Sequence, residues 1–135
     1  MGRILGIDHG DVRIGIAMSD ETAFLASPLT TVLNGKAAAD EIAALVQEHN
    51  VETIVIGLPL NMDGSAGPAT EKVRRFSKKL ASKTDVPIVE SDERLTTVTA
   101  HYNLREAGLD GKKRKGVVDM AAAQVILQDW LDAQP

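Results

Sequence analysis

The chain has 135 residues, of which 44% are hydrophobic and 25% are charged. These values are typical of one soluble domain with its own core, over residues 1–135, and they exclude a disordered chain. Cysteine is absent, which excludes disulfides, thiolate catalysis and cysteine-ligated zinc. No apolar run is long enough to span a membrane, and the first residues lack the layout of a signal peptide. We therefore expect a cytoplasmic protein with no membrane partner.

The net charge of −4 argues against a nucleic-acid partner until its distribution is considered. Six basic residues and no acidic residue lie between Lys72 and Lys83, and residues 112–115 add four consecutive basic residues. The rest of the chain is therefore strongly acidic. This asymmetry predicts two segments that can contact a phosphate backbone.

Aliphatic runs predict strands at residues 3–8, 12–19 and 29–33, with a hairpin turn at His9-Gly10-Asp11. Helical spacing of apolar residues begins at Lys36, and residues 53–57 are typical of a strand buried on both faces. After a loop, a second helix begins at Pro68.

The last third predicts a strand at 86–91, a helix at 97–107, a basic loop at 112–115 and a final helix at 117–131. The element order β-β-β-α-β-α-β-α-α predicts an α/β fold: a mixed five-stranded sheet with helices on both faces.

Three carboxylate positions stand where the pattern calls for apolar residues. Asp8 ends the first strand, which we expect to be central, although a local turn hydrogen bond is the simpler interpretation. Asp119 is the only charge between residues 117 and 127, where a contact with the helix dipole is an equal alternative. Asp92 and Glu93 end the fifth strand, and one of this pair is expected to meet Asp8; a solvated strand end is the alternative.

If these carboxylates converge, protons or hard cations must relieve their repulsion. Oxygen-only ligands suit Mg²⁺ or Mn²⁺, and two such ions about 3.5–4 Å apart can activate water and stabilise the leaving oxygen in phosphodiester hydrolysis. The basic segments would then hold the nucleic-acid backbone. The candidate nucleic-acid-binding residues are Arg74, Arg75, Lys78, Lys79, Arg94, Lys112, Lys113, Arg114 and Lys115.

Four segments, residues 5–20, 57–64, 92–97 and 112–128, closely resemble the YqgF family, also called RuvX. Its members are described as Holliday junction resolvase-like proteins and as pre-16S rRNA nucleases. The resemblance implies an RNase H-like fold, with Asp8, one acid of the Asp92-Glu93 pair and Asp119 as catalytic, metal-binding carboxylates. We prefer Glu93 to Asp92, which we keep as a further candidate metal ligand.

The resemblance also implies maturation of the 5′ end of small-subunit ribosomal RNA in the cytoplasm. The expected partners are structured RNA such as pre-16S rRNA, together with ribosomal particles and branched DNA. Three alternatives remain open. They are a Holliday-junction-type DNA resolvase, a non-catalytic RNA- or ribosome-binding module, and a nucleotide phosphotransferase of the actin and hexokinase type, which would have to bind ATP.

Overall fold

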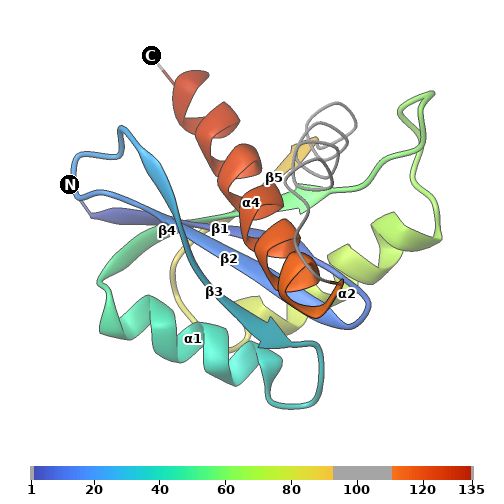
Figure 1. The fold of residues 1–135 in the computed structure, drawn as a ribbon, viewed down its shortest axis with the longest axis horizontal. Coiled ribbons are helices and arrows are strands. Elements are labelled where there is room, and N and C mark those ends of the chain that lie inside the picture. Colours follow the sequence, from blue (N-terminus) through green and yellow to red (C-terminus); the bar gives the residue numbers. More distant parts are fainter. Residues whose placement is uncertain (1, 93–110, 135) are drawn as a thin grey trace.

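The computed structural model describes residues 2–92 and 111–134, and side chains within the last segment from residue 118 onward. The elements occur in the predicted order (Figure 1). They are β1 (Arg3–His9), β2 (Arg13–Ser19), β3 (Ala26–Leu33), α1 (Ala38–Glu48), β4 (Val51–Leu58), α2 (Pro68–Ala81), β5 (Ile88–Asp92) and α4 (Gly111–Asp132). The helix predicted at 97–107 lies outside the described residues.

The five strands form one mixed sheet in the order β3-β2-β1-β4-β5. The predicted β1–β2 hairpin is confirmed as an antiparallel pair, while β1 pairs with β4 and β4 with β5 in parallel. β1 is therefore the central strand, as expected. Helices cover both faces of the sheet and bury β1 and β4, which explains why those strands are nearly continuous runs of aliphatic residues.

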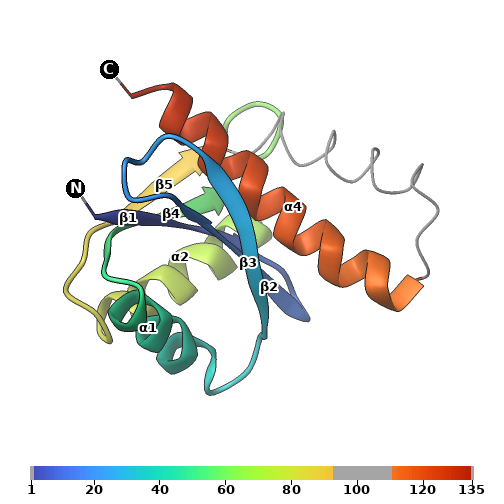
Figure 2. The same cartoon turned by 60° about the vertical axis from the view of Figure 1, so that its left-hand side comes forward.

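The two faces of the sheet are covered by different helices, as Figure 2 shows. α1 and α2 pack on one face over a core of large aliphatic side chains such as Leu5, Ile7 and Ile54. α4 crosses the other face over a smaller core that includes Ala17, Ala123 and Leu127. None of the described helices is both long enough and apolar enough to cross a membrane.

Two glycines let α4 lie against the sheet. A Cβ atom on Gly15 would stand 1.9 Å from the backbone oxygen of Asp119, and one on Gly6 would stand 2.7 Å from Cβ of Leu127. No side chain can be accommodated at these separations without moving the helix. The backbone of α4 is therefore in direct contact with the backbone of β1 and β2.

The third strand is longer than predicted, because it begins at Ala26 and passes through Pro28. β3 lies at the edge of the sheet, and its register with β2 shifts between Ile16 and Ala17. Proline is tolerated in edge strands and at such irregularities, since its missing N–H need not join the ladder. The predicted start of this strand at residue 29 is therefore wrong.

The predicted basic loop at 112–115 is also wrong, because α4 begins at Gly111 and includes Lys112, Lys113, Arg114 and Lys115. Lysine and arginine are strong helix formers, so a run of four does not by itself interrupt a helix. The predicted start at 117 was placed at the first apolar residues, whereas the helix begins six residues earlier, at Gly111.

Candidate active site

Asp8 is the second-last residue of β1, at the carboxyl end of the central strand. Side chains alternate along a strand, and Ile4 and Gly6 contact α4 or its core. Asp8 shares their face of the sheet, so its half-buried side chain is directed to the α4 side.

Asp119 comes to the same place from α4, 111 positions further along the chain. Asp8 pairs with Gly15 in the hairpin register, and Gly15 is the residue against which the Asp119 backbone packs. Directly opposed residues of an antiparallel pair have Cα atoms roughly 4.5–5.5 Å apart. The structure therefore brings Asp8 and Asp119 together as neighbours on one face of the sheet.

Arg13 holds Asp119. Its Nε atom donates to Oδ2 of Asp119 at 3.1 Å, and the two side chains are only 27% and 20% exposed. A charge-assisted hydrogen bond in this half-buried setting fixes the carboxylate more firmly than a surface ion pair would. Sequence reasoning assigned no role to Arg13. The available signal was alternation, because Arg13, Gly15 and Ala17 share the strand face that packs on α4.

Asp92 ends β5 on the other face of the sheet. It is paired with Leu58, and Glu90, two residues earlier, bonds Arg74 of α2 at 3.4 Å. The register therefore places Asp92 on the α2 side, opposite Asp8. Glu93 and Arg94 lie outside the described residues. Within the part of the chain that is described, no three carboxylate or histidine side chains are close enough together to hold a metal ion.

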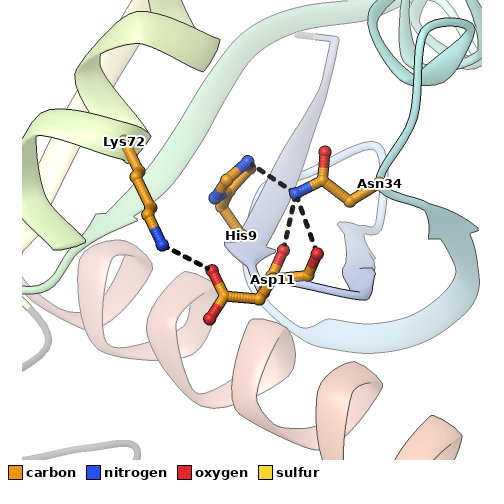
Figure 3. Close-up of polar contacts among 5 residues, drawn as sticks. His9, Asp11, Asn34 and Lys72 are labelled. Atoms are coloured by element: carbon orange, nitrogen blue, oxygen red, sulfur yellow. Dashed lines mark hydrogen bonds and ion pairs between the residues drawn. The ribbon is translucent and has the colours of Figure 1, made fainter.

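The β1–β2 turn beside Asp8 is fixed by a side-chain amide (Figure 3). Nδ2 of Asn34 donates to the Gly10 carbonyl oxygen at 2.8 Å and lies 3.3 Å from Nε2 of His9. An amide nitrogen can only donate, so this contact makes Nε2 of His9 the acceptor and puts the imidazole proton on Nδ1. Lys72 of α2 reaches the same turn through Asp11 at 3.3 Å.

His9 follows Asp8 but faces the opposite side of β1, where its ring lies 4.7 Å from that of Phe76. Burial lowers the pKa of His9 below its usual 6.5, although the nearby carboxylate of Asp11 opposes the shift. Asp8 and His9 therefore lie on opposite faces of the sheet. The first belongs to the α4 face, and the second anchors the hairpin to α2.

The predicted nucleic-acid-binding residues of α2 are exposed, on the opposite face of the sheet from α4. Arg74 is paired with Glu90. α2 follows β4 and runs back across the sheet, so Lys78 and Lys79 lie further from the Asp8 edge than Lys72 does. The basic positions 112–115 instead form the first turns of the helix that carries Asp119.

Proteins solved with Holliday junctions, or named for them, are among the structures that share this fold. A *Thermus thermophilus* RuvC structure in complex with a Holliday junction substrate aligns with a TM-score of 0.57 at 15% identity, over 97% of this chain and 94% of that one. The fowlpox virus Holliday junction resolvase aligns with a TM-score of 0.60 at 11% identity, over 98% and 99% of the two chains. The likeness confirms the predicted RNase H-like fold.

The family described as RuvX, Holliday junction resolvase, matches residues 2–133, and the chain belongs to it. Relatives named "Putative pre-16S rRNA nuclease" include one from *Syntrophus aciditrophicus*, 47% identical over 97% of this chain and 89% of that protein. Another, from *Anaeromyxobacter* sp., is 46% identical over 98% of each chain. Membership confirms the predicted family and the nuclease class, enzymes that hydrolyse phosphodiester bonds, and disfavours the phosphotransferase alternative.

Proposed function

We propose that residues 1–135 act as one metal-dependent nuclease domain that processes the 5′ end of pre-16S rRNA in the cytoplasm. The observation that carries the proposal is that Gly15 pairs with Asp8 and packs against the backbone of Asp119. Two acidic side chains on one half-buried face of the sheet, in a family of phosphodiester hydrolases, suit the binding of a divalent cation.

The donor atoms fit a hard divalent cation. Asp8 and Asp119 offer carboxylate oxygens, and the described part of the site contributes no sulfur ligand, since the chain lacks cysteine. We assign Asp8, Asp119 and Glu93 as ligands of Mg²⁺ or Mn²⁺, with Asp92 as a more distant acidic neighbour. A cation held there supplies Lewis-acid activation of water and neutralises phosphate charge, and a pair of cations would do both at once.

The chain's own residues position the reacting groups. The Arg13 bond to Asp119 fixes the orientation of that carboxylate, and Asn34 keeps the turn after Asp8 in one conformation. Both contacts pre-organise the site, so less ordering remains to be done when substrate binds. We assign Arg94 and the basic first turns of α4 to the substrate phosphates.

The substrate assignment rests on two features. Relatives at 46–47% identity carry the pre-16S rRNA nuclease name. Four consecutive basic residues also form the first turns of the helix that carries Asp119, which suits structured RNA presented by a ribosomal particle. Because each phosphate contact releases counterions, RNA affinity should fall steeply with added salt.

The deciding experiment is cleavage of a 5′-labelled pre-16S rRNA leader by the wild type, Asp119→Asn and Glu48→Gln, with and without Mg²⁺ or Mn²⁺. Glu48→Gln removes one exposed carboxylate of α1 and serves as the matched control. We expect metal-dependent cutting that only Asp119→Asn abolishes, with RNA binding retained by all three. Binding without cleavage by the wild type would overturn the nuclease proposal and favour the non-catalytic binding module.

A four-way DNA junction belongs in the same assay, because the family description and both aligned structures concern Holliday junctions. Faster metal-dependent cutting of the junction than of the leader would favour the resolvase alternative. It would leave the proposed carboxylate site in place.

A further inference from the structure

A hollow lies at the end of the molecule away from Asp8. Its volume is about 630 Å³, and its lining comes from the starts of β1 and β4, the loop between β2 and β3, and the last turn of α4. Figures 1 and 2 both show these segments gathered near the two chain ends. Asp119 and Leu131 are 12 residues apart on α4, or about 18 Å at the helical rise. This hollow, which we call the distal cavity, is therefore separate from the candidate active site.

Half of the residues that line the distal cavity are apolar, and they include two aromatic side chains. Ile4 and Leu131 are buried at its base, Trp130 is partly exposed, and Phe24 projects beside it with 78% of its surface exposed. Leu25 next to Phe24 is 59% exposed. Large apolar side chains grouped around a hollow are typical of a protein-binding surface.

The loop that carries Phe24 is held firmly in place. Oδ1 of Asp20 accepts the backbone N–H groups of Phe24 and Leu25 at 2.8 and 2.9 Å, and Oδ2 accepts the hydroxyl of Thr22. These bonds hold the pKa of Asp20 well below its ordinary value. From α4, Nε2 of Gln128 donates to the Phe24 carbonyl oxygen at 3.1 Å. The backbone that carries the exposed ring is thus pre-organised, which lowers the entropy cost of binding through this loop.

The rim of the cavity is acidic. Glu52 and Asp132 line it, and Asp129 lies one turn before Asp132 on α4. The last turn of α4 contains no basic residue, although the negative end of the helix dipole favours cations there. Burial and the neighbouring Asp132 raise the pKa of Asp129. These charges repel one another and a nucleic acid, and a positively charged ligand would relieve their repulsion.

We propose that the distal cavity docks a lysine- or arginine-rich segment of a partner protein that carries a large aliphatic or aromatic side chain. The apolar side chain packs against Phe24 and Trp130, while the basic side chains pair with Glu52 and Asp132. An apolar anchor inside a charged rim is the usual arrangement of a specific protein interface. The cavity acts as a recruitment surface, independent of the hydrolytic site.

The test uses intrinsic fluorescence, because Trp130 is the one tryptophan in the chain. The full-length protein is titrated with a tryptophan-free peptide of lysine and leucine. Two control peptides are used. The first has glutamate in place of every lysine, and the second has alanine in place of every leucine. We expect a saturable change in Trp130 emission with the lysine–leucine peptide, and at least about tenfold weaker binding of either control.

Two variants locate the binding. Phe24→Ser removes an apolar anchor and Asp132→Lys reverses a rim charge, and each should weaken binding of the lysine–leucine peptide about tenfold. The matched controls, Leu33→Ser on β3 and Glu48→Lys on α1, change equally exposed residues elsewhere and should bind normally. Cleavage of the RNA leader by Phe24→Ser should equal that of the wild type.

Three results would overturn the proposal. They are no saturable signal from the wild type, an equal response to the glutamate–leucine peptide, or equal weakening by the control variants. Sedimentation velocity adds a fourth. Self-association that Phe24→Ser abolishes, without peptide binding, would assign the cavity to a second copy of this chain.

Discussion

The two faces of the central sheet are built in different ways. On the α1–α2 face, side chains such as Ile7, Ile54 and Leu80 fill a thick apolar layer between helices and strands. On the α4 face, Gly6 and Gly15 have no side chains, so the helix backbone lies directly on the strands. The first face contributes most of the buried apolar surface. The second gives up that volume and gains a short, fixed distance between elements.

A short distance is what a carboxylate site needs. Asp119 can neighbour Asp8 only because no Cβ atom separates α4 from β2 at Gly15. A side chain at position 15 would push α4 away from β2 and so move Asp119 away from Asp8. The comparison predicts that one face chiefly stabilises the protein and that the other carries the chemistry, and substitutions on both faces test that division.

Gly15→Ala should have the largest combined effect. The new Cβ would stand 1.9 Å from the Asp119 oxygen, and neither backbone can yield by side-chain rotation, so α4 must shift. We expect a loss of about 1–3 kcal/mol in stability, as for overpacking. Cleavage should fall about a hundredfold, because the two carboxylates are misplaced. Urea unfolding and the leader-cleavage assay measure the two losses.

Gly35→Ala is the control for Gly15→Ala, because Gly35 has open space where a Cβ would be added. It should leave cleavage unchanged. If Gly15→Ala keeps full activity, the close contact between α4 and β2 does not position the site.

Ile54→Ala tests the other face. The side chain is completely buried in the α1–α2 core, and its truncation should cost about 2–5 kcal/mol of unfolding free energy through lost transfer energy and a residual cavity. Cleavage per folded molecule should stay within about twofold of the wild type, since small changes in a distant core rarely move a site. A loss of activity as large as that of Gly15→Ala would erase the distinction between the faces.

His9 should show the smallest effect, and only at acidic pH. Its pKa is lowered in the folded protein, so the unfolded chain takes up the proton first as the pH drops below about 6.5. Folding is then opposed increasingly as the pH falls through that window. His9→Gln keeps an acceptor for Asn34 and cannot titrate. In parallel urea unfolding, the free energy of unfolding of the wild type should fall more between pH 7.5 and pH 5.5 than that of His9→Gln. An equal fall for the two proteins would contradict this.

The sequence predicted most of the fold because its elements are locally encoded. The aliphatic runs, the turn at Gly10 and the helix start at Pro68 each need only neighbouring residues for their interpretation. The two errors were also local. Pro28 lies in an edge strand, and the basic run at 112–115 lies within a helix. The residues of each segment alone do not reveal the edge position or the extent of the helix.

The candidate site divides in the same way. Asp8 and Asp119 were predicted because each interrupts an apolar pattern, a property of single segments. The bond from Arg13 to Asp119 joins residues 106 positions apart, and the face of Asp92 depends on its register with Leu58. The distal cavity likewise needs four separate segments.

Composition and periodicity determined the class of fold and the residues suited to cation binding, since those follow from local hydrophobicity and charge. Which side chains meet was decided by packing alone. Contacts between distant segments depend on how closely α4 approaches the sheet, and that distance is set by the fold as a whole.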